Sequence, residues 1–301
     1  MKLELIIPTI PVDLETCLYN KNYFFKYLPI TSIKFIGNKE VGRLVNSLND
    51  PLLTYMDENV ICGYEEFKNI VCKKIKNDGG ILGWYYQQFL KIMYASKCED
   101  EYYLVWDSDT IPIHEIKLFN NEGKPYFDLK TEFHEEYFET IDKAWDLSKC
   151  IDQSFISEHM LFKKTYVIEM MNYIKCKDKL KGNDFLDKIV NVIAEVGYAK
   201  LAFSEYETYG TYVMNYHRDD YELRMWKSMR RATWCLDKKN INDSQMKWLV
   251  CYYDAITFEK RDTCKKMMKW LVNQYLFRLL IKADVFDKYY EKIARRIYKS
   301  R

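Results

Sequence analysis

The first half of the chain alternates short apolar runs with stretches in which apolar residues recur at helical spacing. The apolar runs predict four strands, of which the third is the weakest: residues 3–7, 31–36, 60–62 and 102–106. The helical spacing predicts helices over residues 13–27 and 84–95. Strands that alternate with helices in this order are typical of an α/β fold with a mostly parallel sheet and helices on both faces.

The pattern changes after the fourth strand. Residues 114–150 are polar and show no clear periodicity, whereas residues 155–164 predict another apolar element and residues 165–173 a helix. No internal repeat is visible in the sequence. We expect an α/β domain over residues 1–225 and a helical extension over residues 226–301.

Two amphipathic helices are predicted near the end of the chain, over residues 267–280 and 285–297. Residues 260–301 carry 13 Lys or Arg against 4 Asp or Glu, a net charge of +9. The whole chain has a net charge of +2, so the remaining residues carry −7. Basic amphipathic helices can lie on an anionic membrane surface, or they can pack on the domain with a charged face toward water. Both alternatives stay open, and without a recognised nucleic-acid motif we expect no nucleic-acid partner.

Nine cysteines are scattered along the chain, without a Cys-x-x-Cys pair. This pattern is neither a disulfide framework nor a zinc site, and it suits a reducing compartment. The first residues lack the apolar core of a signal peptide, and no run reaches the ~18 apolar residues that a membrane span needs. We therefore expect a cytoplasmic protein, placed on the inner face of the cell membrane if its basic tail binds there.

Two candidate site residues, Asp107 and Asp109, directly follow the strand predicted over residues 102–106. Alternation along an extended chain points these two carboxylates the same way. Paired carboxylates suit a hard divalent cation such as Mg²⁺ or Mn²⁺, which keeps open positions for phosphate oxygens. A cation held in this way can stabilise a nucleotide diphosphate as a leaving group.

Two enzyme classes place Asp-x-Asp after an apolar strand. In phosphatases of the haloacid-dehalogenase kind Asp107 would be the nucleophile, but that residue normally follows the first strand, and about a hundred residues precede it here. The acidic segment at residues 182–187 also has no clear strand leading into it. These features favour the other class, the nucleotide-sugar-dependent glycosyltransferases. A non-catalytic sugar-nucleotide-binding or scaffold protein of polysaccharide assembly stays open as a third alternative.

Four ordered blocks fall within residues 1–216 and carry a family resemblance: residues 83–91, 104–110, 154–162 and 203–210. With these blocks the sequence resembles a bacterial family of glycosyltransferases of the A fold (GT-A) that act in polysaccharide, capsule and lipopolysaccharide synthesis. The resemblance implies a GT-A-type, Rossmann-like nucleotide-binding sheet, with Mn²⁺ or Mg²⁺ as the cofactor. It also implies transfer of a hexose from a nucleotide-diphosphate sugar, expected to be uridine-based, to a saccharide or lipid-linked saccharide acceptor.

The resemblance further implies roles for residues around the donor. Asp109 is expected as the main metal ligand, Asp107 as a ligand through water or a partner of the ribose, and His217 as a third ligand. Thr9 and Asp13 follow the first strand and could bond the base or the ribose. Asp13 is equally well explained as a charge in the first turn of a helix.

Tyr85 and Gln88 lie with Lys91 on the helix that precedes the Asp-x-Asp strand. Its polar side chains could bond the base or the ribose of the nucleotide. The same residues are also explained by an ordinary amphipathic helix that packs on the sheet.

Glu158 and His159 are expected beneath the donor sugar, where they would bond sugar hydroxyls. Glu205 is expected as the base that takes the proton from the acceptor hydroxyl if the reaction inverts the anomeric carbon. Ser204 and Glu207 fit the Ser-x-x-Glu pattern of a helix N-cap, so Glu207 is expected to be structural.

Overall fold

The computed structural model of the chain describes residues 3–75, 81–239, 241–259 and 266–274. Contacts within the chain divide it into two units. The first unit comprises Met1–Glu15, Pro29–Ser108 and Lys117–Met225, and the second comprises Thr16–Leu28, Asp109–Ile116 and Trp226–Arg301.

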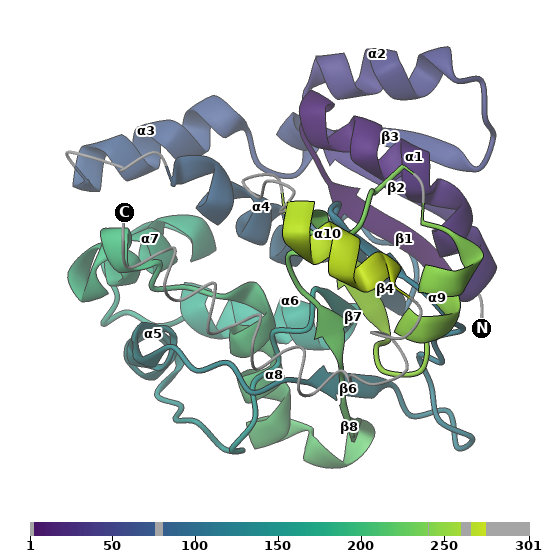
Figure 1. The fold of residues 1–301 in the computed structure, drawn as a ribbon. Helices are drawn as coiled ribbons and strands as arrows, with labels where there is room; N and C mark the ends of the chain where they lie inside the picture. Colours follow the sequence, from purple (N-terminus) through teal and green to yellow (C-terminus); the bar gives the residue numbers. More distant parts are fainter. Residues whose placement is uncertain (1–2, 76–80, 240, 260–265, 275–301) are drawn as a thin grey trace. The chain divides into compact units, whose positions relative to one another are not determined.

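The first unit contains most of the secondary structure (Figure 1). Its strands are β1 (Leu3–Pro8), β2 (Ile30–Gly37), β3 (Leu53–Asp57), β4 (Tyr102–Trp106), β6 (Tyr126–Leu129), β7 (His159–Lys163) and β8 (Glu222–Met225). Its helices are α2 (Lys39–Ser47), α3 (Tyr64–Lys74), α4 (Leu82–Met93), α5 (Glu135–Trp145), α6 (Lys164–Lys175), α7 (Phe185–Val196) and α8 (Glu205–Tyr216). Helix α1 (Pro11–Tyr27) begins in this unit and continues in the second.

Five strands of the first unit form one sheet in the order β3-β2-β1-β4-β7 (Figure 1). Strands β3, β2, β1 and β4 run parallel to their neighbours, and β7 pairs antiparallel with β4, so that Trp106 lies opposite His159. The short strands β6 and β8 form a separate parallel pair. The predicted mixed α/β fold with a mostly parallel sheet is thereby confirmed.

Helices cover both faces of this sheet. Ile6, Val105 and Met56 face the large core cluster to which α4 also contributes. The side chain next to Met56 points to the opposite face, because successive strand residues alternate. There Tyr55 packs on α2, so closely that a Cβ on Gly42 would come within 2.5 Å of the Tyr55 ring. Glycine at this position lets α2 lie directly on the sheet.

Most predicted elements of the first half are confirmed, but the third strand is wrong. The residues predicted as that strand, 60–62, follow a 3-10 turn at Glu58–Val60, and the strand is β3 at Leu53–Asp57. Ile61 and Cys62 are buried against the core without being part of the sheet. Burial of a short apolar run therefore did not distinguish a strand from a packed turn.

The polar stretch at residues 114–150 contains structure that was not expected there. Helix α5 buries one stripe of side chains at helical spacing: Tyr137, Thr140, Ile141, Ala144 and Trp145. The period is present in the sequence, but a threonine lies within the stripe and acidic residues surround it. Thr140 is satisfied in the core because its hydroxyl donates to the carbonyl of Ala202.

The second unit holds a three-stranded sheet in the order β5 (Thr110–Pro112), β10 (Ala255–Thr257), β9 (Ser228–Met229). It also holds α9 (Asp243–Leu249) and α10 (Lys266–Asn273). The segment after residue 225 is thus not purely helical. Helix α10 covers the start of the helix predicted over residues 267–280, and the one predicted over residues 285–297 lies outside the described residues.

Among the residues that the structure describes, no helix is both long and apolar enough to span a bilayer. In α10 the side chains of Met267 and Trp270 are exposed, whereas Val272 is fully buried. Contact of this basic tail with a membrane stays a prediction.

Candidate functional site

Asp107 lies at the carboxyl end of the parallel sheet. All five residues of β4 are buried, and Asp107 is the first residue beyond them. Its backbone N–H donates to the carbonyl of Glu158 at 2.9 Å, which ties the end of β4 to the start of β7. Its side chain is 32% exposed. In α/β sheets, ligands bind beyond the carboxyl ends of the strands, and Asp107 has this position.

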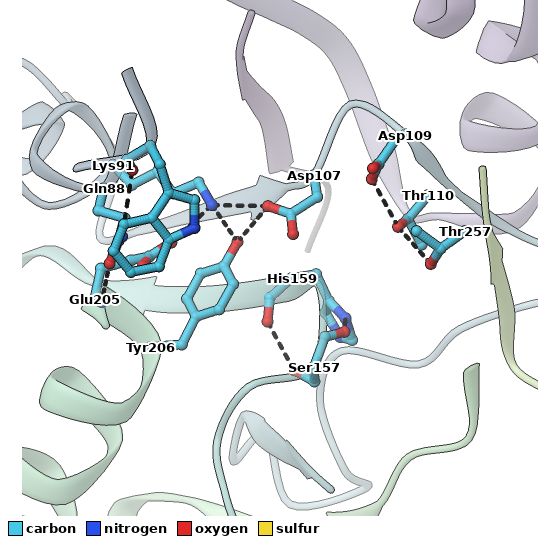
Figure 2. Close-up of polar contacts among 11 residues, drawn as sticks. Gln88, Lys91, Asp107, Asp109, Thr110, Ser157, His159, Glu205, Tyr206 and Thr257 are labelled. Carbon is cyan, nitrogen blue, oxygen red and sulfur yellow. Dashed lines mark hydrogen bonds and ion pairs between the residues drawn. The ribbon is translucent and has the colours of Figure 1, made fainter. Parts of the chain in front are cut away.

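A buried ammonium group holds Asp107 from within the fold (Figure 2). Lys91 of α4 is 3% exposed, and its Nζ lies 2.7 Å from Asp107 Oδ1 and 2.7 Å from Glu205 Oε1. The ammonium also donates to the Tyr206 hydroxyl at 3.1 Å, and that hydroxyl donates to Asp107 Oδ1 at 3.2 Å. We call Lys91, Asp107, Glu205 and Tyr206 the Lys91 cluster.

The sequence brings these groups together through two helix ends. Ser204 is the N-cap of α8, and its hydroxyl accepts from the backbone N–H of Glu207 at 3.3 Å. Gln88 of α4 accepts from the backbone N–H of Glu205 at 3.2 Å. This bond holds the first turn of α8 against α4. Lys91 lies about one turn beyond Gln88 on α4, so the Glu205 carboxylate lies next to its ammonium.

Only half of the predicted capping box forms. The side chain of Glu207 does not return to its own cap but accepts from the Ser154 hydroxyl at 2.6 Å and from the Phe155 N–H at 3.2 Å. Glu207 therefore anchors the segment that leads into β7. Burial raises the pKa of the Glu207 carboxyl, and the bonds from Ser154 and Phe155 oppose that rise.

In the Lys91 cluster one ammonium group lies between two carboxylates, in a region largely sheltered from water. Burial by itself would lower the pKa of Lys91, but the carboxylates of Asp107 and Glu205 outweigh burial and raise it. Burial raises the pKa of Glu205, with Lys91 opposing the rise. Burial and the Asp107 charge also raise the pKa of the Tyr206 hydroxyl. Lys91 therefore stays an ammonium, and Tyr206 stays a neutral hydroxyl at ordinary pH.

Glu158 and Lys130 form a second, partly buried ion pair beside the end of β4. The Lys130 ammonium lies 2.5 Å from Glu158 Oε1. Glu158 has a φ of 64°, in the left-handed region that residues other than glycine seldom adopt. This conformation aims the Glu158 carbonyl at the N–H of Asp107. Backbone strain of this kind gathers at functional sites.

His159 is built into a third polar group. Its Nε2 lies 2.9 Å from Asp128 Oδ2, its Nδ1 lies 2.9 Å from the Ser157 carbonyl, and its ring stacks on Trp106 with centroids 4.5 Å apart. Arg224 holds the same Asp128 through two bonds of 2.6 and 2.7 Å. Burial would raise the pKa of Asp128, but His159 and Arg224 outweigh burial and lower it. Both ring nitrogens of His159 are thus engaged inside the protein.

Asp109 belongs to the second unit. Its carbonyl accepts from the Phe258 N–H at 2.8 Å, and Oδ1 accepts from the Thr110 hydroxyl at 3.3 Å. Thr110 in turn shares a 2.8 Å hydrogen bond with the Thr257 hydroxyl across the β5–β10 pair (Figure 2). Burial, followed by the negative charge of Asp109, raises the pKa of the Cys17 thiol.

Other residues expected around the nucleotide take part in packing. The Tyr85 hydroxyl donates to the Tyr198 carbonyl at 2.8 Å and accepts from the Ala202 N–H at 2.9 Å. Gln88 holds the start of α8, as described above. A further role of Tyr85 or Gln88 in ligand binding stays a prediction.

Thr9 and Asp13 follow β1, as the sequence predicted. Thr9 is buried, and its N–H donates to the carbonyl of Ile36 at 2.8 Å. Asp13 lies in the first turn of α1, where a negative charge favours the helix. Contact of either residue with the nucleotide stays a prediction.

His217 lies at the opposite end of α8 from Glu205. Its ring stacks on Tyr166 with centroids 3.8 Å apart, and its Nε2 lies 3.0 Å from Glu169 Oε2. Since a helix rises ~1.5 Å per residue, roughly 18 Å of helix separates the two ends of α8. The structure therefore does not bring His217 together with Asp107. Among the described residues, no group of three or more His, Cys, Asp or Glu side chains is placed to hold a metal.

The donor chemistry at Asp107 nevertheless suits a hard cation. Carboxylate oxygens are the ligands that Mg²⁺ and Mn²⁺ prefer. Oδ1 of Asp107 is occupied by Lys91 and Tyr206, whereas within the described part of the chain no hydrogen bond reaches Oδ2. Oδ2 is therefore the atom through which Asp107 could meet a ligand.

The sequence alone assigned no role to Tyr206, Asp128 or Arg224, and it did not identify the partners of Lys91. One signal was available. Lys91 stands in the apolar run Phe89-Leu90-Lys91-Ile92 on a helix, and a lysine buried at such a position needs carboxylate partners. The sequence could not say which carboxylates these are.

The fold and the site define a mixed α/β protein with a buried ion cluster and a partly exposed carboxylate at the carboxyl ends of its parallel strands. A model of the family described as a family of unknown function (DUF6492) matches residues 36–267, and the chain belongs to this family. No curated protein matches the chain.

Solved structures of glycosyltransferases resemble the chain at low similarity. Mouse xyloside xylosyltransferase 1 in its apo form is 10% identical with a TM-score of 0.42, over 85% of this chain and 97% of that one. The galactosyltransferase LgtC with donor and acceptor sugar analogs is 10% identical with a TM-score of 0.42, over 86% and 88%. The glycosyltransferase GlyE of Streptococcus pneumoniae TIGR4 is 8% identical with a TM-score of 0.36, over 97% and 64%.

Proposed function

We propose that this protein is a glycosyltransferase that binds a nucleotide-diphosphate sugar at the carboxyl ends of its parallel strands. The observation that carries the proposal is Asp107, which directly follows buried β4 and keeps one oxygen open while Lys91 holds the other. This position in an α/β sheet is where nucleotides bind. The Asp-x-Asp pattern and the order of the four sequence blocks support the same function.

A divalent cation, Mn²⁺ or Mg²⁺, fits the oxygen ligands of the Asp-x-Asp pair. We propose that Asp107 and Asp109 hold it, as their spacing in the sequence predicts. When bound, such a cation offsets the negative charge that develops on the departing diphosphate. The chain's own residues fix Asp107 for this purpose, since Lys91 from α4 and the Glu158 carbonyl before β7 hold it from two sides.

Glu205 has a different proposed role from the one expected at first. Its side chain is 5% exposed and paired with Lys91, so an acceptor hydroxyl could reach the carboxylate only after that pair opens. Holding Lys91 against Asp107 requires no movement. We therefore propose Glu205 as a positioning residue. Its role as the base that deprotonates the acceptor remains the competing proposal.

The acceptor proposed here is a saccharide or lipid-linked saccharide, and the donor is proposed to carry uridine. The basic segment of residues 260–301 would hold the protein at an anionic membrane beside such a lipid. Vesicles with and without anionic lipid test this part: salt-sensitive co-sedimentation with anionic vesicles alone supports it, and equal behaviour with both kinds refutes it.

Thermal shift with a panel of nucleotide-sugars, with and without Mn²⁺, tests the donor site. The wild-type protein is expected to gain stability with one donor plus Mn²⁺, because a ligand that binds only the folded state stabilises it. Asp107→Asn and Asp109→Ala should lose this gain, while Glu4→Gln at the other end of the sheet should keep it. Absence of any donor effect in the wild type would refute the proposal. Release of phosphate from phosphomonoesters would instead favour the phosphatase alternative.

A further inference from the structure

The three protons of the Lys91 ammonium match three acceptors. They are Asp107 Oδ1 at 2.7 Å, Glu205 Oε1 at 2.7 Å and the Tyr206 hydroxyl at 3.1 Å. The ammonium also lies 4.5 Å from the centre of the Tyr206 ring. Lys91 therefore has no donor left for a substrate, and whatever it does at the site it does through its neighbours.

Only one member of the Lys91 cluster reaches the surface. The side chains of Lys91 and Glu205 are almost fully buried, whereas that of Asp107 is partly exposed. The cluster holds two carboxylates and one ammonium, a net charge of −1. Because the buried charges are poorly screened, their sum is felt at Asp107 Oδ2, where a ligand would arrive.

We propose that Lys91 and Glu205 set the charge that Asp107 presents to its ligands, with Lys91 weakening the hold on a bare divalent cation and strengthening the hold on a diphosphate. Glu205 acts in the opposite sense by offsetting part of the Lys91 charge. This inference rests on the proposed function, and it makes both residues positioning residues. Because the cation and the diphosphate have opposite charges, we expect each to strengthen the binding of the other, by the same factor as linkage requires.

Two variants separate the charge of the cluster from its ion pair. Glu205→Gln keeps the shape and the acceptor oxygen but brings the net charge from −1 to 0. The double variant Lys91→Met with Glu205→Gln returns it to −1 without the ion pair. Lys91→Met alone leaves a buried carboxylate unpaired and is avoided for that reason. Glu4→Gln alters a more exposed ion pair, with Lys34, that lies away from Asp107 and serves as the control.

Two binding measurements need no catalytic turnover. Free Mn²⁺ is followed by electron paramagnetic resonance, and UDP without metal is followed by calorimetry, with every variant measured at the same pH and ionic strength. Glu205→Gln is expected to weaken Mn²⁺ binding about tenfold or more and to tighten UDP binding several-fold. The double variant should bind Mn²⁺ within about threefold of the wild type, and Glu4→Gln should match the wild type.

Opposite shifts for the two ligands are the signature of charge tuning. A purely structural role for Glu205 would weaken both ligands together, and the double variant would then be worse than the single one. Weaker binding of both ligands by Glu205→Gln, or unchanged affinities in that variant, overturns the inference. The proposed function still stands in that case if the wild type binds Mn²⁺ and UDP. If the wild type binds neither ligand, the proposed function fails as well. Circular dichroism of each variant is the control that tests whether the fold is retained.

Discussion

The two ends of helix α8 show how different the environments of similar polar residues can be. At its first turn, Glu205 pairs with the ammonium of Lys91 and both are buried. Beyond its last turn, His217 pairs with Glu169 and stacks on Tyr166, where the Glu169 side chain is 47% exposed. The sequence predicted a site residue at each end, Glu205 and His217. Only the first end contacts Asp107, so burial and partners, not residue type, distinguish them.

The largest effect is expected from breaking the buried end. Lys91→Met removes the ammonium but leaves Glu205 without a partner inside the fold. Losing one member of a buried pair costs about 3–5 kcal/mol of unfolding free energy. Urea denaturation followed by circular dichroism measures this, and a loss below about 1 kcal/mol would mean that the pair is not buried as described.

Asp107→Asn tests whether the buried end serves a ligand. Because the amide has no charge to offer a cation, donor affinity in the presence of Mn²⁺ is expected to fall at least about a hundredfold. Calorimetric titration with the donor identified by thermal shift measures it. Unchanged affinity would separate Asp107 from the ligand altogether.

The pairing of Asp128 with His159 and Arg224 can be tested through the pH dependence of stability. The folded-state pKa of Asp128 is lowered below 3.8, so its contribution to stability is present above that pH and is lost as pH falls through the lower folded-state value. Arg224→Met removes a paired contact and is expected to cost about 2 kcal/mol at neutral pH. Urea unfolding at neutral pH and at the acid limit should show this cost shrinking in acid. A cost independent of pH would contradict the assignment.

Gly210 lies in the middle of α8, between the two ends compared above. A Cβ there would overlap the ring of Phe155, which is itself fully buried. Gly210→Ala is expected to cost about 1–3 kcal/mol, since overpacking outweighs the better helix propensity of alanine. Thermal unfolding measures it, and a stabilised variant would show that α8 and the segment of Phe155 lie further apart.

The smallest effect is expected at the far end. His217→Ala should leave Mn²⁺-supported donor affinity within about threefold of the wild type and cost less than about 1 kcal/mol, as for exposed pairs. The same titration as for Asp107→Asn decides this. Loss of Mn²⁺ dependence would restore His217 as a metal ligand and would reverse the contrast between the two ends.

Much of the sheet could be predicted because its strands are short apolar runs with clear stops, as at residues 3–7 and 102–106. The N-cap at Ser204 was also visible, since it depends on neighbours in the sequence. The pairing of Lys91 with Glu205 joins residues 114 positions apart. Such contacts depend on how α4 and α8 pack, and no local pattern carries that information.

Dependence on long-range packing also explains why some residues had two possible roles in the sequence analysis. Gln88 and Glu158 have types that suit ligand binding, and the structure engages both with other protein groups. A polar residue near a site satisfies either a ligand or the fold, and sequence spacing alone does not separate these demands.

Release of nucleoside diphosphate from nucleotide-sugars tests most directly whether Asp107 anchors a donor site. The protein is incubated with each donor and Mn²⁺, and the diphosphate is quantified for the wild type, Asp107→Asn and His217→Ala. We predict release from one donor by the wild type and His217→Ala, and almost none by Asp107→Asn. Equal release by all three proteins, or none by the wild type with any donor, would contradict this prediction.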